Sequence, residues 1–85
     1  MSDSLLEQVK AVLIDVLRLN AQASLWREDA PLLGAVPELD SLAVINVITS
    51  LEDHFQIRIH DDEVSSELFA TLGNLTAFVR EKSTR

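Results

Sequence analysis

The sequence predicts an all-α fold: a small bundle of three main helices plus one short helix, with a long ordered loop between the first two helices. Apolar residues recur at helical spacing in three segments, and both prolines fall in the connection after the first of them. The later connections are short, which favours a compact bundle. Because 85 residues can form one modest core, we expect residues 1–85 to be a single domain.

The first helix is predicted over residues 4–19. Its apolar residues lie three or four positions apart, which places them on one face of a helix. They are Leu5, Leu6, Val9, Val12, Leu13, Val16 and Leu17. Asp3 or Ser4 is the expected N-cap, because either side-chain oxygen can accept a hydrogen bond from an unpaired amide.

A long connection, "NAQASLWREDAPLLGAVPE", follows the first helix. Its prolines, glycine and charged residues argue against a continuous helix. Trp26, Leu32 and Leu33 are apolar, and they predict an ordered loop that packs across the helices. Trp26 is expected to anchor this loop to the core, with a contact to an acyl chain or to a partner as the alternative.

The second helix should begin at Asp40 or Ser41 and end near His54. One face of it is expected to turn inward, and its residues are Leu42, Ile45, Ile48, Leu51 and Phe55. A second apolar face contains Ala43, Val44 and Val47. Periodicity leaves two interpretations of this second face open. Either the long loop covers it, through Val36 or Leu39, or it is an exposed docking surface.

The last third of the chain predicts an extended piece, a short helix near Asp61–Ser66 and a closing helix. Thr71 is the expected cap of the closing helix. Its inward residues are expected to be Leu72, Leu75, Phe78 and Val79. Arg80 and Lys82 near its end suit the negative end of a helix dipole.

Composition excludes several classes of function. The net charge is −7, with no cluster of basic residues, which argues against binding nucleic acid or an anionic membrane surface. There is no cysteine, and therefore no disulfide, thiolate nucleophile or cysteine metal site. The chain lacks a signal-peptide pattern and any apolar run near the roughly 20 residues that span a bilayer. We expect a monomeric cytoplasmic protein without membrane insertion.

The stretch "PELDSLAVI" places Asp40 and Ser41 where a helix begins. The simplest interpretation is capping, since Asp and Ser are among the commonest helix N-caps. The alternative is functional. A serine at a helix start points its hydroxyl outward, beside unpaired amides and the positive end of the helix dipole, which favours an attached phosphate.

A helix, a long loop, Asp-Ser-Leu at a helix start, "LEDHF", an acidic short helix and "TLGNLTAFV" follow one another in order. This ordered set resembles the acyl carrier protein family over essentially the whole chain. The resemblance implies that Ser41 carries 4′-phosphopantetheine, supported by Asp40, and that the thiol of this group bears acyl groups as thioesters. It also implies two kinds of partner: a phosphopantetheinyl transferase, and acyl ligase, acyltransferase or synthase enzymes.

The sequence departs from the family pattern on both sides of Ser41. Glu38 and Leu39 replace the usual glycine and small residue, and Ala43 and Asn46 replace acids on the second helix. If the apolar face is exposed, partners would dock there mainly by apolar burial, which favours a specialised pathway. The stretch "PLLGAVPELDSLAVINVITSLEDHF" resembles variant acyl carrier proteins that accompany exosortase and acyl-ligase systems.

Acidic residues gather at the end of the second helix and beyond it, where they form either a docking surface or a solvated face. The docking candidates, beside Leu42, Ala43, Val44 and Val47, are Glu52, Asp53, Asp61 and Asp62. The spacing of these acids matches no EF-hand, so we assign no metal site.

A serine hydrolase would need a histidine near Ser41, but His54 lies thirteen residues along the same predicted helix, about 20 Å away. The chain is therefore not expected to be an enzyme. Two functions without catalysis compete with an acyl carrier. One is a peptidyl carrier protein, and the other is a helical interaction module in which Ser41 is only a cap.

Overall fold

The structure, a computed structural model, describes residues 4–83. Its elements are α1 (Ser4–Leu17), the 3-10 helix η1 (Ala21–Leu25), α2 (Ser41–Phe55), the 3-10 helix η2 (Asp61–Glu63) and α3 (Leu72–Ser83). Within these residues there is no β-strand, only one isolated antiparallel bridge between Pro31 and Thr71. The predicted all-α bundle of three main helices is confirmed.

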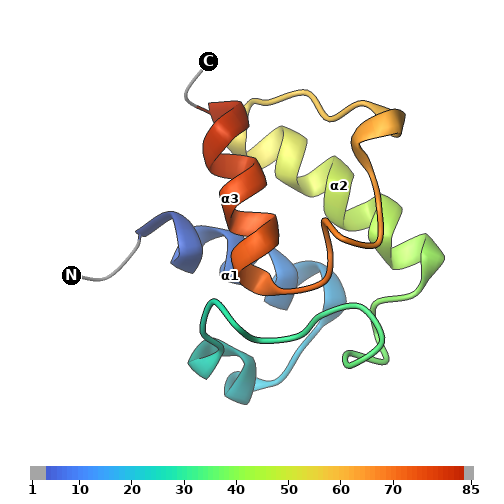
Figure 1. The fold of residues 1–85 in the computed structure, drawn as a ribbon. Helices are drawn as coiled ribbons and strands as arrows, with labels where there is room; N and C mark the ends of the chain where they lie inside the picture. Colours follow the sequence, from blue (N-terminus) through green and yellow to red (C-terminus); the bar gives the residue numbers. More distant parts are fainter. Residues whose placement is uncertain (1–3, 84–85) are drawn as a thin grey trace.

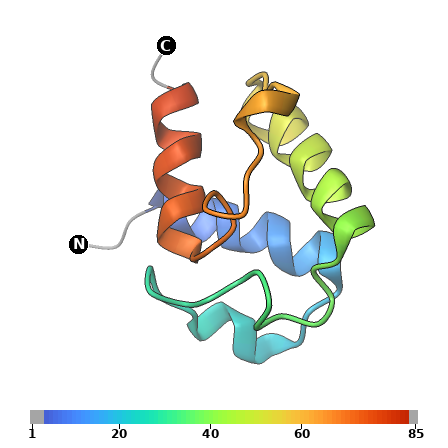
Figure 2. The same ribbon diagram turned by 45° about the vertical axis from the view of Figure 1, so that its right-hand side comes forward.

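The three helices enclose one core. In Figures 1 and 2, α1 runs across the molecule while α2 and α3 rise on either side of it, and the α1–α2 connection passes below α1. The core draws its side chains from α1, α2 and α3, from the long loop and from the connection between α2 and α3. Its fully buried members include Val9, Leu13, Leu32, Val47, Leu51, Phe69, Leu72, Leu75 and Val79. This packing holds the start of α2 at one end of the bundle, beside the long loop (Figure 1).

Helix α1 ends two residues earlier than predicted. Arg18 adopts a left-handed backbone conformation, with φ 56°, and the amide of Leu19 donates to the carbonyl of Ile14 at 3.1 Å. This is the usual geometry of a helix C-terminus. Asp3, one of the two predicted caps, lies outside the described residues, and Ser4 is the first helical residue.

The long loop is ordered, as predicted. The amide of Leu32 donates to the carbonyl of Ala70 at 3.1 Å, and the amide of Leu72 donates to the carbonyl of Ala30 at 2.9 Å. Leu32 is buried, whereas Leu33, the other predicted leucine anchor, is 43% exposed. Backbone pairing with the entry to α3 therefore fixes the loop, in addition to apolar anchors.

Gly73 permits the closest approach between the loop and α3. Its amide donates to the carbonyl of Glu28 at 2.7 Å, and a Cβ atom at this position would lie 2.8 Å from the same oxygen. Such a distance is far inside van der Waals contact. The glycine is therefore required by the approach of two backbones.

Lys10 of α1 is buried and forms a hydrogen bond to the backbone of η1. The residue is only 4% exposed, and its Nζ donates to the carbonyl of Ser24 at 2.9 Å and to Glu7 at 3.0 Å. A buried ammonium needs such partners, because its desolvation is costly. Neither η1 nor the burial of Lys10 was predicted from the sequence.

Helix α2 is rotated relative to the prediction. Val47 and Leu51 are fully buried, whereas Leu42 is 68% exposed and Ile45 is 60% exposed. The assignment of Leu42 and Ile45 to the inward face is therefore wrong. Both apolar stripes satisfy helical periodicity, and the contacts with α1 and with the loop decide which of them is buried.

The α2–α3 connection contains less helix than predicted. The short helix η2 spans only Asp61–Glu63, where residues 61–66 were expected. At the end of α2, Gln56 has a left-handed backbone conformation, and Glu52 accepts a hydrogen bond from the amide of Ile59 at 2.8 Å. Thr71 caps α3 as predicted, accepting from the amide of Asn74 at 3.1 Å.

Candidate functional site

Asp40 and Ser41 differ in their hydrogen bonding at the start of α2. Asp40 is the N-cap, and its Oδ1 accepts a hydrogen bond from the amide of Ala43 at 2.8 Å. Its carbonyl also accepts from the amide of Val44 at 2.9 Å. Ser41 is the first helical residue. The interpretation of Ser41 as the helix cap is therefore wrong, because Asp40 already performs that task.

The Ser41 side chain is exposed, and its hydroxyl is available for modification. Among residues 4–83, no hydrogen bond engages its hydroxyl, and the amides of Ser41 and Leu42 have no acceptor. Unpaired amides at a helix N-terminus, together with the positive end of the helix dipole, favour a phosphate. The residues present therefore fit a phosphate group attached to the serine oxygen.

The residues before Ser41 fix its position. Leu39 and Val36 are buried in the core, and the amide of Leu39 donates to the carbonyl of Val36 at 3.0 Å. Leu39, which stands where the family usually has a small residue, thus fastens the chain two positions before the serine. Glu38 is exposed beside it.

The face of α2 around Ser41 is uncharged and partly apolar. Leu42 and Ile45 are exposed, while Ala43 and Val44 are half-buried. Val47 is fully buried, so its assignment to an exposed docking face is wrong. Val36 and Leu39, which one of the two interpretations placed over this face, are buried in the same core as Val47.

The predicted acidic docking residues lie at the other end of α2 and on η2. Asp53, Asp61 and Asp62 are exposed. Glu52 is half-buried and is hydrogen-bonded to the amide of Ile59. Asp53 therefore lies about 18 Å from Ser41 along the helix, at 1.5 Å per residue, whereas Asp61 borders the same groove as Val44 and Ile45. A docking role for the acidic or the apolar residues stays a prediction.

A groove of about 280 Å³ runs between α2 and η2. Five branched aliphatic side chains and three polar ones line it: Val44, Ile45, Ile48, Ile59, Val64, Thr49, Glu52 and Asp61. Its volume is about twice that of a cavity that holds benzene. The groove begins one helical turn beyond Ser41 and can accommodate an aliphatic chain of moderate length.

A second hollow, which we call the Trp26 hollow, lies between η1 and the loop that leads to α2. It measures about 200 Å³ and is lined by Leu19, Asn20, Gln22, Ala23, Trp26, Ala35, Val36, Pro37 and Glu38. Trp26 is half-buried and packs against the core, which confirms the predicted anchor. The same side chain also forms part of the wall of the hollow.

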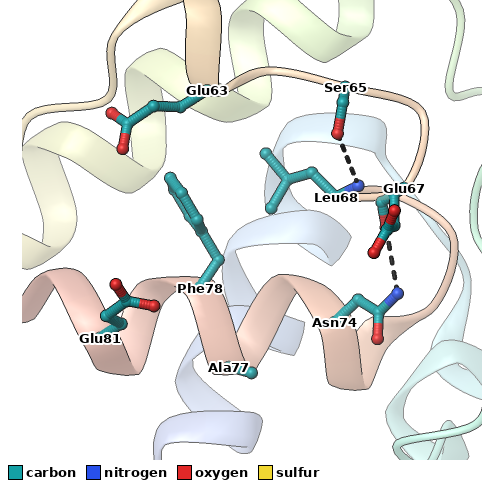
Figure 3. Close-up of a pocket in the computed structure, with 8 residues that line it drawn as sticks. All are labelled: Glu63, Ser65, Glu67, Leu68, Asn74, Ala77, Phe78 and Glu81. Atoms are coloured by element: carbon teal, nitrogen blue, oxygen red, sulfur yellow. Dashed lines mark hydrogen bonds between the residues drawn. The ribbon is translucent and has the colours of Figure 1, made fainter.

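A third hollow, of about 340 Å³, lies between the η2–α3 connection and α3 (Figure 3). Phe78 points into it from α3, and the carboxylates of Glu63, Glu67 and Glu81 surround it. Contact with Lys82, followed by the hydrogen bond from the amide of His60, lowers the pKa of Glu63 below its ordinary value of 4.5. No residue of α2 lines this hollow, so it is separate from the Ser41 site.

The histidines do not join Ser41 in a catalytic arrangement. His54 stands near the far end of α2, where its ring contacts Phe55. Residues 4–83 contain no group of three His, Asp or Glu side chains that could hold a metal ion. No helix in this described part of the chain is long and apolar enough to cross a membrane.

Comparisons with known proteins agree with this geometry. The family described as "phosphopantetheine attachment site" matches residues 7–79. The solution structure of a holo acyl carrier protein from Nitrosomonas europaea is 44% identical, with a TM-score of 0.90. The match covers 98% of this chain and all of that one. Among curated proteins, none matches significantly.

Proposed function

Because the chain belongs to the acyl carrier protein family, whose members carry covalent 4′-phosphopantetheine, we propose that Ser41 is the residue that bears this group. The bound group supplies a thiol at the end of a flexible arm, on which acyl groups are held as thioesters. The chain itself presents the cargo and catalyses no reaction. Tethering the cargo raises its effective concentration near the enzymes that act on it.

The observation that supports this proposal is that Asp40, and not Ser41, caps helix α2. Asp40 caps the helix, which leaves the Ser41 hydroxyl exposed and without a partner among residues 4–83. The free amides of Ser41 and Leu42 can then stabilise a phosphodiester on the serine oxygen. A serine that only capped the helix would instead turn its hydroxyl toward an amide.

Attachment forms one bond and breaks one. The Ser41 oxygen bonds to the phosphorus of coenzyme A that carries pantetheine, the pyrophosphate linkage breaks, and 3′,5′-ADP leaves. The hydroxyl proton passes to a base of the transferase. The second oxygen of Asp40 has no partner among the described residues, so it is free to contact the magnesium ion that the transferase brings.

We propose that the transferase and the acyl-handling enzymes dock on α2. Leu42 and Ile45 offer an exposed apolar contact beside the serine, and half-buried Ala43 and Val44 border it. Asp53 near the far end of α2 and Asp61 and Asp62 on η2 offer negative charge, and half-buried Glu52 precedes Asp53. Apolar burial near the serine would then supply affinity, and the acids would orient the encounter.

The uncharged start of α2 supports a dedicated pathway over general fatty-acid synthesis. From Ser41 to Leu51 the helix contains no charged residue. An enzyme that recognises its carrier through basic residues would find no acid on the first three turns of α2. The aliphatic groove between α2 and η2 favours an acyl cargo over an aminoacyl cargo, since five of its lining residues are branched aliphatics.

Intact mass spectrometry tests the attachment site. The apo-protein is incubated with coenzyme A, magnesium and a broad-specificity phosphopantetheinyl transferase, alongside Ser41→Ala and Ser66→Ala, a control that removes another exposed serine. We expect one adduct on the wild type and on Ser66→Ala, and none on Ser41→Ala. An adduct on Ser41→Ala, or none on folded wild type with two transferases, would refute the proposal.

A further inference from the structure

We propose that the Trp26 hollow binds the phosphopantetheine arm while its thiol is free, an inference that rests on attachment at Ser41. The hollow lies on the loop side of the serine, whereas the aliphatic groove lies on the α2 side. Its occupant would be the arm itself, which is covalently part of the holo-protein.

The arm can reach the hollow. Glu38, on the rim, precedes Ser41 by three residues, so their Cα atoms lie at most about 11 Å apart. From phosphorus to sulfur, the arm has about as many backbone bonds as four to five residues, or roughly 16 Å when extended. The arm is therefore longer than the distance from Ser41 to the rim of the hollow, and its distal part can enter the hollow.

The lining suits the chemistry of the arm. Pantetheine alternates apolar parts, including a pair of geminal methyl groups, with a hydroxyl and two amides. The hollow offers both kinds of group, with Leu19, Trp26 and Pro37 as apolar surfaces and Asn20 and Gln22 as amide side chains. The groove between α2 and η2 is mainly aliphatic, so it suits an acyl chain better than two amides.

Trp26 and Gln22 supply hydrogen-bonding groups that the protein does not use. Among residues 4–83, the indole N–H of Trp26 and the side-chain amide of Gln22 have no partner. The indole ring is held in place by packing against the core, so a contact with it costs little side-chain entropy. A tether at Ser41 gives the arm an effective concentration near millimolar, so even weak contacts are populated.

Nuclear magnetic resonance of apo- and holo-protein tests this inference, with intact mass confirming the loading. Trp26 is the single tryptophan of the chain, so its indole N–H gives one resonance. We expect this resonance to shift on loading, and we expect nuclear Overhauser effects between the indole ring and the geminal methyls of the arm.

Two variants add the same phenyl ring to exposed alanines of different hollows. Ala35→Phe obstructs the Trp26 hollow, whereas Ala77→Phe alters the hollow of Figure 3. We expect both to load fully and only Ala35→Phe to lose the methyl–indole effects. A fully loaded wild type that lacks these effects, or an Ala35→Phe variant that keeps them, overturns the inference but leaves attachment at Ser41 intact. A wild type that gains no mass shows instead that the attachment itself fails.

Discussion

Lys82, near the end of α3, pairs with Glu63 of η2, and its Nζ lies 2.7 Å from Oε1 and 2.6 Å from Oε2 of the carboxylate. The amide of His60 donates to the same Glu63 carboxylate at 2.9 Å, and Lys82 also lies 5.6 Å from the ring centroid of Phe78. This contact fastens the α2–α3 connection to the last helix at the end of the bundle away from Ser41.

The first prediction concerns the pH dependence of this contact. The pKa of Glu63 is lowered from 4.5, chiefly by Lys82. A carboxyl whose pKa is lower in the folded state stabilises the fold fully above its unfolded pKa and loses that contribution as the pH falls through the folded value. We expect Lys82→Met to lose less stability than the wild type between about pH 6 and pH 3.

Urea unfolding at several pH values measures this difference. Glu63→Gln should reduce the acid-dependent loss in the same way, and the double variant should resemble either single variant, because both remove one interaction. Identical pH profiles for the wild type and Lys82→Met would contradict the prediction.

The second prediction separates docking from folding on α2. Leu42→Ser and Ile45→Ser should change the free energy of unfolding by no more than about 0.5 kcal/mol, because both side chains are exposed. Each should lower kcat/KM of the phosphopantetheinyl transferase about tenfold, since a buried leucine contributes about 1.5–3 kcal/mol. Leu25→Ser removes a leucine of η1 that is even more exposed, and it should leave loading unchanged. Equal rates for all three variants would exclude this docking face.

The third prediction concerns Gly73. Alanine is the better helix former by about 1 kcal/mol, so propensity alone predicts that Gly73→Ala stabilises α3. We expect the opposite, a loss of about 1–3 kcal/mol, because the new Cβ would meet the carbonyl oxygen of Glu28 at 2.8 Å. Thermal unfolding would show a lowered melting temperature, and an unchanged or raised one would show that the loop moves aside at no cost.

The fourth prediction concerns Lys10. Lys10→Met keeps the length of the side chain but removes the hydrogen bond to the carbonyl of Ser24, which should cost about 1–3 kcal/mol. Glu7→Gln is the matched control. It removes only the charge of the exposed partner and should cost less than about 1 kcal/mol. Equal effects in chemical denaturation would mean that the Ser24 contact contributes nothing.

Much of the fold could be predicted because its causes are local. The positions of the three helices follow from apolar spacing, and the cap at Thr71 follows from the chemistry of a hydroxyl beside a free amide. Asp40 and Ser41 were correctly placed at a helix start for the same reason. By contrast, η1 was not predicted, because "AQASL" carries no periodic pattern and is held partly by Lys10 from α1.

The sequence by itself determined that a serine begins the second helix, with an aspartate before it and an uncharged stretch after it. Only the tertiary structure decided that Val47 turns inward and that Leu42 and Ile45 remain exposed. The reason is physical: capping and periodicity depend on neighbours within a few residues. The choice between two apolar stripes depends instead on α1 and on the loop around Val36 and Leu39, which are distant in sequence.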